Sequence, residues 1–175
     1  HQQIMATLAR AGNRVVFVES TGVRRATFRD LRRMRLRLRN RRGWAGTREE
    51  LPGLVVHSPV VLPFPYSRLA LAANGPMLVR EVRQCLDGIG IERPIVWSFL
   101  PTPLSYRLAA AVKARLTIYH CVDDFRSSST AAAQIRASES RWFNDADLVF
   151  VTSQRLRHRA EAHSSRVHLF PSGVD

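Results

Sequence analysis

The sequence predicts an α/β fold built on a doubly wound parallel sheet, and two observations carry this prediction. First, six short apolar runs, rich in branched and aromatic side chains, recur along the chain without polar alternation, at residues 15–18, 54–56, 95–99, 116–119, 148–151 and 167–170. Such runs are typical of strands that are buried on both faces. Second, segments with helical periodicity separate the runs, so strands and helices alternate as they do in βαβ units.

The helical segments come in chain order with recognisable ends. Residues 2–9 form the first, which ends at Gly12, where glycine can adopt the left-handed conformation that closes helices. We infer a further strand before this helix, because a helix in a βαβ unit follows a strand. Asn74 is the expected N-cap of the second helix, with Pro76 in its first turn. The stretch 40–53 lacks periodicity and is expected to be a loop.

Three more helices follow the third, fourth and fifth apolar runs. The first of them opens at Pro101 and Pro103. The next carries an apolar stripe that includes Ile135 and Trp142, and Ser153 or its neighbour Thr152 is expected to cap the last. We therefore assign residues 1–170 to one Rossmann-like domain that lacks its first strand, and residues 171–175 to the start of a linker towards a second domain.

Several classes of site are excluded by the composition. The two cysteines, Cys85 and Cys121, are 36 residues apart and form no CxxC pair, which argues against a disulfide scaffold or a zinc site and suits the cytoplasm. Neither GxGxxG nor the phosphate-binding pattern GxxxxGK[ST] occurs, so no phosphate-cradling glycine loop is expected. We expect no bound cofactor and no metal. No apolar stretch reaches the roughly 20 residues of a membrane-spanning helix.

The net charge of +13 is concentrated in one segment. Between Arg24 and Arg42 there are ten arginines and a single acid, Asp30. A helix here would have one apolar and one basic face, and two interpretations stay open: it lies on anionic lipid at the inner face of the plasma membrane, or it packs on the sheet with a solvated outer face. Nucleic acid is not expected as a partner, because no aromatic platform or known motif accompanies the charge.

Candidate site residues follow the predicted strands, because ligands in an open parallel sheet bind beyond the carboxyl ends of its strands. The fourth run is followed by His120, Asp123 and Asp124, and Ser98 lies at the end of the third. These groups can bind sugar hydroxyls or move a proton. The alternative is that one aspartate caps the next helix while the other is solvated. Glu19 closes the first run and is expected to be a polar residue at a strand mouth.

In four stretches, the sequence resembles bacterial glycosyltransferases of the GT-B fold, including the family 1 and family 4 groups. Residues 1–19 are similar to the opening helix and second strand of that family, and residues 94–99 to the strand before its interdomain cleft. Residues 119–125, YHCVDDF, resemble a YDCVDDF-type segment in which His120 replaces an aspartate. Residues 146–153 and 170–175 resemble the last two motifs, with Ser172 in place of the usual asparagine.

The resemblance implies that this chain is the amino-terminal, acceptor-side half of a transferase, inactive alone. The enzyme would move a sugar from a nucleotide-sugar donor to a sugar or lipid-linked acceptor in the synthesis of cell-surface polysaccharide or glycolipid. His120 and Asp123 are then the expected catalytic residues, and His1, Ser98 and Asp124 the expected substrate-binding residues. A GT-B nucleotide-sugar epimerase and a non-catalytic binding module remain alternatives.

Overall fold

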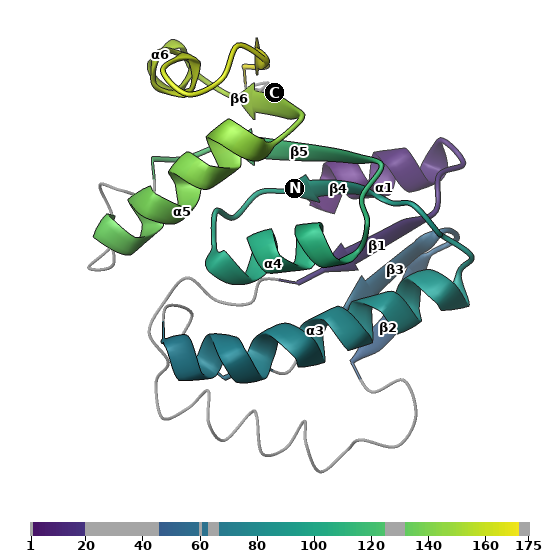
Figure 1. Ribbon diagram of the computed structural model, residues 1–175. Helices are drawn as coiled ribbons and strands as arrows, with labels where there is room; N and C mark the ends of the chain where they lie inside the picture. The colour runs from purple at the N-terminus through teal and green to yellow at the C-terminus, as the bar shows by residue number, and fades with distance from the viewer. Residues whose placement is uncertain (1, 20–45, 60, 63–66, 125–131, 172–175) are drawn as a thin grey trace, which may run out of the picture. The chain divides into compact units, whose positions relative to one another are not determined.

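The computed structural model describes residues 2–19, 46–59, 61–62, 67–124 and 132–171 (Figure 1). The chain divides into two compact units. The units are His1–Glu92 and Arg93–Asp175. The assignment of residues 1–170 to a single domain stays a prediction, and residues 172–175 of the expected linker lie outside the described part of the chain. None of the helices in the described ranges combines the length and the apolar character that a bilayer-spanning segment needs.

The first unit contains a three-stranded mixed sheet in the order β1-β3-β2. Its elements are α1 (Gln2–Arg10), β1 (Val15–Val18), β2 (Thr47–Leu51), β3 (Leu54–His57) and α3 (Arg68–Gly88). β1 and β3 are parallel, whereas β2 runs antiparallel to β3. As predicted, α1 ends at Gly12, whose φ is +87°. The amides of Gly12 and Asn13 donate to the carbonyls of Ala9 and Leu8, which is the Schellman arrangement.

The expectation of a loop over residues 40–53 is wrong from residue 47 onward. β2 forms there and is joined to β3 by a two-residue turn of Pro52 and Gly53. Gly53 has a φ of +82°, a conformation that glycine adopts without steric cost. β2 pairs with a neighbour on one side only and exposes its three central residues, so its sequence carries no apolar pattern. The Pro-Gly dipeptide was the signal that sequence could have used.

The expected cap of the second helix is also wrong, because the N-cap of α3 lies seven residues before Asn74. Its N-cap is Ser67, whose Oγ accepts from the amide of Ala70 at 3.4 Å. Asn74 lies inside the helix, almost completely buried. Its side chain accepts from the amide of Leu62 at 2.7 Å and donates to the Leu62 carbonyl at 2.9 Å. The asparagine therefore fixes the segment before the helix rather than starting the helix.

The second unit is a four-stranded, wholly parallel sheet in the order β4-β5-β6-β7, as the sequence predicts. Its elements in chain order are β4 (Ile95–Ser98), α4 (Pro103–Ala111), β5 (Leu116–Cys121), α5 (Ala132–Asp145), β6 (Leu148–Val151), α6 (Gln154–Glu161) and β7 (Val167–Leu169). Thr102 and Ser105 form a capping box around Pro103 at the start of α4. Ser153 caps α6, as predicted.

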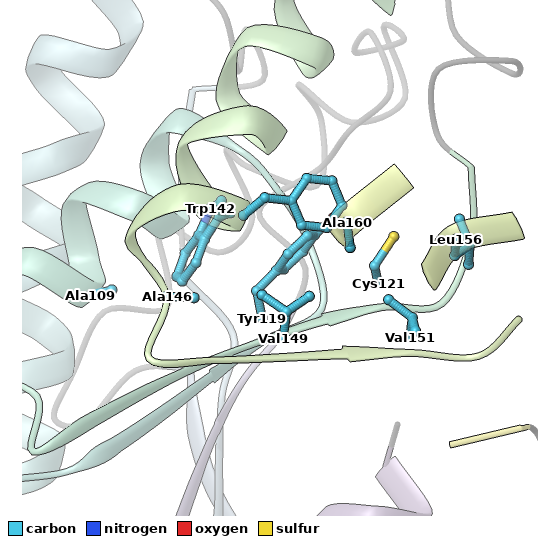
Figure 2. Close-up of a cluster of buried hydrophobic side chains, with 10 residues drawn as sticks. Ala109, Tyr119, Cys121, Trp142, Ala146, Val149, Val151, Leu156 and Ala160 are labelled. Carbon is cyan, nitrogen blue, oxygen red and sulfur yellow. The ribbon is translucent and has the colours of Figure 1, made fainter. Parts of the chain in front are cut away.

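The core of this unit lies on one face of its sheet, where all three helices contribute side chains. Neighbouring strands follow one another in chain order, and right-handed crossovers then place every helix on the same face. Figure 2 shows Tyr119 and Cys121 of β5 beside Val149 and Val151 of β6. The helices add Ala109, Trp142, Phe143, Leu156 and Ala160 to this cluster.

Candidate functional site

His120 lies inside β5 and not after it, which corrects the position that the sequence suggested. β5 continues to Cys121, two residues beyond the apolar run at 116–119. Successive side chains of a strand point to opposite faces of the sheet. Tyr119 and Cys121 belong to the helix-covered core, so His120 points to the other face. The histidine and the two aspartates therefore do not share one loop.

The imidazole of His120 is surrounded by aromatic rings. Its ring centroid lies 5.9 Å from Trp97, 5.2 Å from Phe99 and 6.0 Å from Phe150. His120 is only 7% exposed, and neither of its ring nitrogens has a hydrogen-bond partner in the described part of the chain. Burial lowers the pKa of the His120 imidazole, because the charged form loses hydration. The ring is therefore neutral at pH 7, with two unused polar atoms.

Ser98 occupies the opposite face from His120. It is the last residue of β4 and pairs in register with Tyr119, whose ring belongs to the helix-covered core. Its hydroxyl donates to the carbonyl of Leu100 at 3.0 Å, so the group is engaged locally and mostly buried. The prediction that Ser98 binds substrate stays untested. His1 lies outside the described residues.

Asp123 and Asp124 follow β5 at its carboxyl end and have different surroundings. Asp123 is exposed, and within the described ranges its carboxylate makes no hydrogen bond or ion pair. The carboxylate of Asp124 accepts from Arg159 Nη1 at 2.7 Å and from Arg155 Nη1 at 3.4 Å. Adjacent carboxylates thus point to different environments, as the sequence suggested. Asp123 is the group that a ligand can reach.

Arg159 connects this rim to the core through a second carboxylate. Its Nη2 donates to Glu139 Oε1 at 2.7 Å, and Glu139 is 2% exposed. The same oxygen accepts from the Tyr119 hydroxyl at 3.0 Å. The Cys121 sulfur lies 3.3 Å from Arg159 Nη2. A chain of contacts therefore runs from α5 through α6 to the residue after Asp123.

Burial and the Glu139 carboxylate set the protonation of this network. Burial, with the nearby Cys121 and Glu139, raises the pKa of Tyr119 well above its usual value. Burial first, and then the Glu139 carboxylate, raise the pKa of Cys121 to about 12. Burial by itself would lower the pKa of Arg159. The nearby Glu139, Cys121 and Asp124 outweigh this effect, so the net shift of the Arg159 pKa is upward. At neutral pH the thiol and phenol are therefore uncharged donors around an ion pair.

The pattern of α5 contains a signal for this network that sequence reasoning missed. Glu139 lies four residues after Ile135 and three before Trp142, in the middle of the buried stripe of the helix. A carboxylate on a buried helix face requires a cationic or hydrogen-bonding partner. The identity of that partner, Arg159, depends on tertiary packing, because 20 residues separate the two. Breaking a buried pair of this kind costs about 3–5 kcal/mol.

The first unit has a separate polar cluster after β1 and β3. Glu19 accepts from Arg48 at 3.0 Å and from the hydroxyl of Ser58, so it is a polar residue at a strand mouth, as expected. The buried His57 contacts Thr47 at 3.1 Å and Glu81 at 3.3 Å. In the residues that the structure describes, no group of histidine, cysteine and acidic side chains has the arrangement of a metal site. The segment from Arg24 to Arg42 lies outside these residues.

Replacing His120 with phenylalanine is expected to raise the free energy of unfolding by about 1 kcal/mol, because two buried polar atoms without partners disappear. The folded-state pKa lies below the unfolded value of about 6.5, so stability is complete above that pH and falls as the pH drops through the folded-state pKa. The variant should lose less stability than the wild type between about pH 7.5 and pH 5. Urea denaturation at several pH values measures both effects.

His168→Phe is the matched control, because His168 is exposed and lies beside Phe150 on the next strand. It should change stability little. A His120→Phe protein that is less stable than the wild type at pH 7.5 would show that the imidazole nitrogens have partners in solution.

Comparison with known proteins supports the fold. The sequence matches no protein-family model and no curated protein. Two solved structures of sucrose-phosphate synthase from Thermosynechococcus elongatus are similar to the chain at 16% identity over 99% of its length. One has a TM-score of 0.59, with 84% of that chain covered. The other has a TM-score of 0.64, and the present chain spans only 41% of the length of that structure's chain. The chain thus has the α/β, Rossmann-like fold of one half of a GT-B glycosyltransferase.

Proposed function

We propose that this chain is the acceptor-side half of a glycosyltransferase that moves a sugar from a nucleotide-sugar donor to an acceptor. The fold likeness to sucrose-phosphate synthase supports a transferase of this kind. The observation that carries the proposal is the position of Asp123. It is an exposed carboxylate at the carboxyl end of β5, a strand with neighbours on both sides, where parallel sheets bind their ligands.

The chemistry of the transfer gives the carboxylate a role. The bond between the anomeric carbon and the diphosphate oxygen breaks, and the nucleoside diphosphate leaves with the electron pair. An acceptor hydroxyl oxygen forms the new bond to that carbon and loses its proton. With inversion of the anomeric centre, Asp123 takes this proton as general base. With retention, the departing diphosphate oxygen takes the proton and Asp123 accepts a hydrogen bond from a sugar hydroxyl.

The other candidate residues take supporting roles in this proposal. The neutral His120 is buried on the opposite face of β5, and its two ring nitrogens have no partner among the described residues; it is the second candidate to accept the proton. We propose Ser98, Asp124 and His1 as residues that bind the substrate. The nucleotide is held mainly by a second domain, so we expect the natural protein that contains this chain, rather than the chain alone, to be active.

Asp123→Asn keeps the size of the side chain and removes the acceptor of the proton. In the natural full-length protein we expect kcat to fall by a factor of about 100 or more, with little change in KM. The turnover is measured as release of nucleoside diphosphate from a panel of uridine, adenosine and guanosine diphosphate sugars. Product analysis identifies the sugar that is transferred.

Arg157→Ala is the control for this substitution, because Arg157 pairs with Glu161 on the exposed side of α6 and should leave kcat unchanged. An Asp123→Asn protein with wild-type turnover would contradict the assignment. A donor that is converted to its epimer without transfer would instead support a nucleotide-sugar epimerase.

The arginine-rich segment extends the proposal to the acceptor. We propose that the ten arginines between Arg24 and Arg42 hold the protein at an anionic membrane surface, where a lipid-linked acceptor is found. Each basic residue near such a surface contributes roughly 1 kcal/mol. This attraction is electrostatic and is therefore screened by salt.

Co-sedimentation with vesicles should show binding to phosphatidylglycerol-containing membranes, no binding to phosphatidylcholine alone, and release at about 0.5 M salt. Replacing Arg32, Arg33, Arg35 and Arg37 with glutamine should abolish it. The control removes the same charge at four exposed arginines elsewhere, namely Arg10, Arg80, Arg93 and Arg136. Binding that is indifferent to lipid charge and to salt would refute membrane attachment through this segment.

A further inference from the structure

We infer that Arg159 is a positioning residue that fixes residues 122–124, called the loop below, and thereby presents Asp123 to the substrate. Its guanidinium joins Asp124 at the rim to Glu139 in the core. The inference rests on the proposed function, because it assigns a role to residues around the carboxylate that would serve the transfer.

The geometry of the guanidinium suits two anchors at once. Nη1 donates to Asp124 Oδ1 and Nη2 to Glu139 Oε1, each at 2.7 Å. These are short, charge-assisted bonds, and the planar fork of arginine fixes the angle between them. The side chains of Arg159, Asp124 and Glu139 are 14%, 13% and 3% exposed, so water screens the ion pairs little.

Asp123 lies between two anchored neighbours. On one side, the hydroxyl of Thr152 donates to the carbonyl of Val122 at 3.0 Å. On the other side, Arg159 holds the carboxylate of Asp124. The backbone is therefore held on both sides of Asp123, while the Asp123 side chain itself is left exposed to solvent. A catalytic group needs such support, because a carboxylate on a loose loop spends little time in the reactive geometry.

A purely structural role for Arg159 makes a different prediction. In that case the Glu139–Arg159 pair stabilises the packing of α5 and α6, and the bond to Asp124 has no effect on the loop. Asp124→Asn separates the two interpretations, because it weakens the rim contact and leaves the buried pair in place. Arg159→Lys is the second variant: it keeps the charge, but a single ammonium cannot reproduce the fork.

Cys121 provides a readout that needs no substrate. Its sulfur lies 3.3 Å from Arg159 Nη2, and the residue is fully buried at the start of the loop. Cys85 is the other cysteine of the sequence, so a Cys85→Ala background leaves Cys121 as the single thiol. Opening of the loop then appears as faster reaction of Cys121 with 5,5′-dithiobis(2-nitrobenzoic acid).

The test compares Asp124→Asn and Arg159→Lys with the matched controls Glu161→Gln and Arg157→Lys, which alter an exposed ion pair on the same helix. We expect amide hydrogen exchange at residues 122–124 and labelling of Cys121 to become at least about tenfold faster in the first two variants and to stay unchanged in the controls. Circular dichroism confirms that each variant is folded.

Unchanged exchange and labelling in a folded Asp124→Asn protein would overturn the inference, and this variant decides the question if Arg159→Lys does not fold. Transfer assays then separate the two proposals. A looser loop in a protein that transfers no sugar would leave the positioning role intact and reject the proposed function. Unchanged loop dynamics in the Asp124→Asn variant of a protein that does transfer sugar would reject the positioning role and leave the proposed function intact.

Discussion

The buried ion pair between Glu139 and Arg159 is the interaction on which the carboxyl edge of the second unit depends. A carboxylate that is 2% exposed requires a charged partner, since desolvation of an isolated ion costs far more than a domain can supply. Arg159 satisfies Glu139 with one nitrogen and reaches Asp124 with the other. The same guanidinium therefore contacts both the packed helices α5 and α6 and Asp124 after β5.

The alternation of side chains along β5 divides the candidate site into two parts. Tyr119 and Cys121 project into the helix-covered core and contact Glu139, whereas His120 projects into an aromatic cluster on the other face. Only beyond the end of the strand does an acidic side chain, Asp123, become exposed. The exposed carboxylate of Asp123 thus follows the strand, whereas the neutral imidazole of His120 is buried on the face opposite to the helices.

Sequence alone predicted most of the strands and little of the polar network. Continuous apolar runs identified β1 and β6 with their observed bounds, because both are apolar strands of parallel pairs in which no residue is fully exposed. β2 escaped detection because an edge strand with exposed charged residues has no apolar pattern. The prediction that Asn74 caps α3 was wrong because the side chain of Asn74 makes its hydrogen bonds to Leu62, a tertiary contact that sequence does not reveal. The pairing of Glu139 with Arg159 likewise depends on how two helices pack, although a lone glutamate on a buried stripe indicated a partner.

A double-mutant cycle on Arg159→Lys and Asp124→Asn measures how strongly the guanidinium holds the rim carboxylate, with free energies of unfolding determined for the wild type, both single variants and the double variant. A guanidinium that holds the rim carboxylate through a short, poorly screened bond should give a coupling energy of about 1 kcal/mol or more. Additive effects of the two substitutions, with a coupling energy near zero, would mean that Arg159 and Asp124 are neighbours without energetic consequence and that the loop carrying Asp123 is held by other contacts.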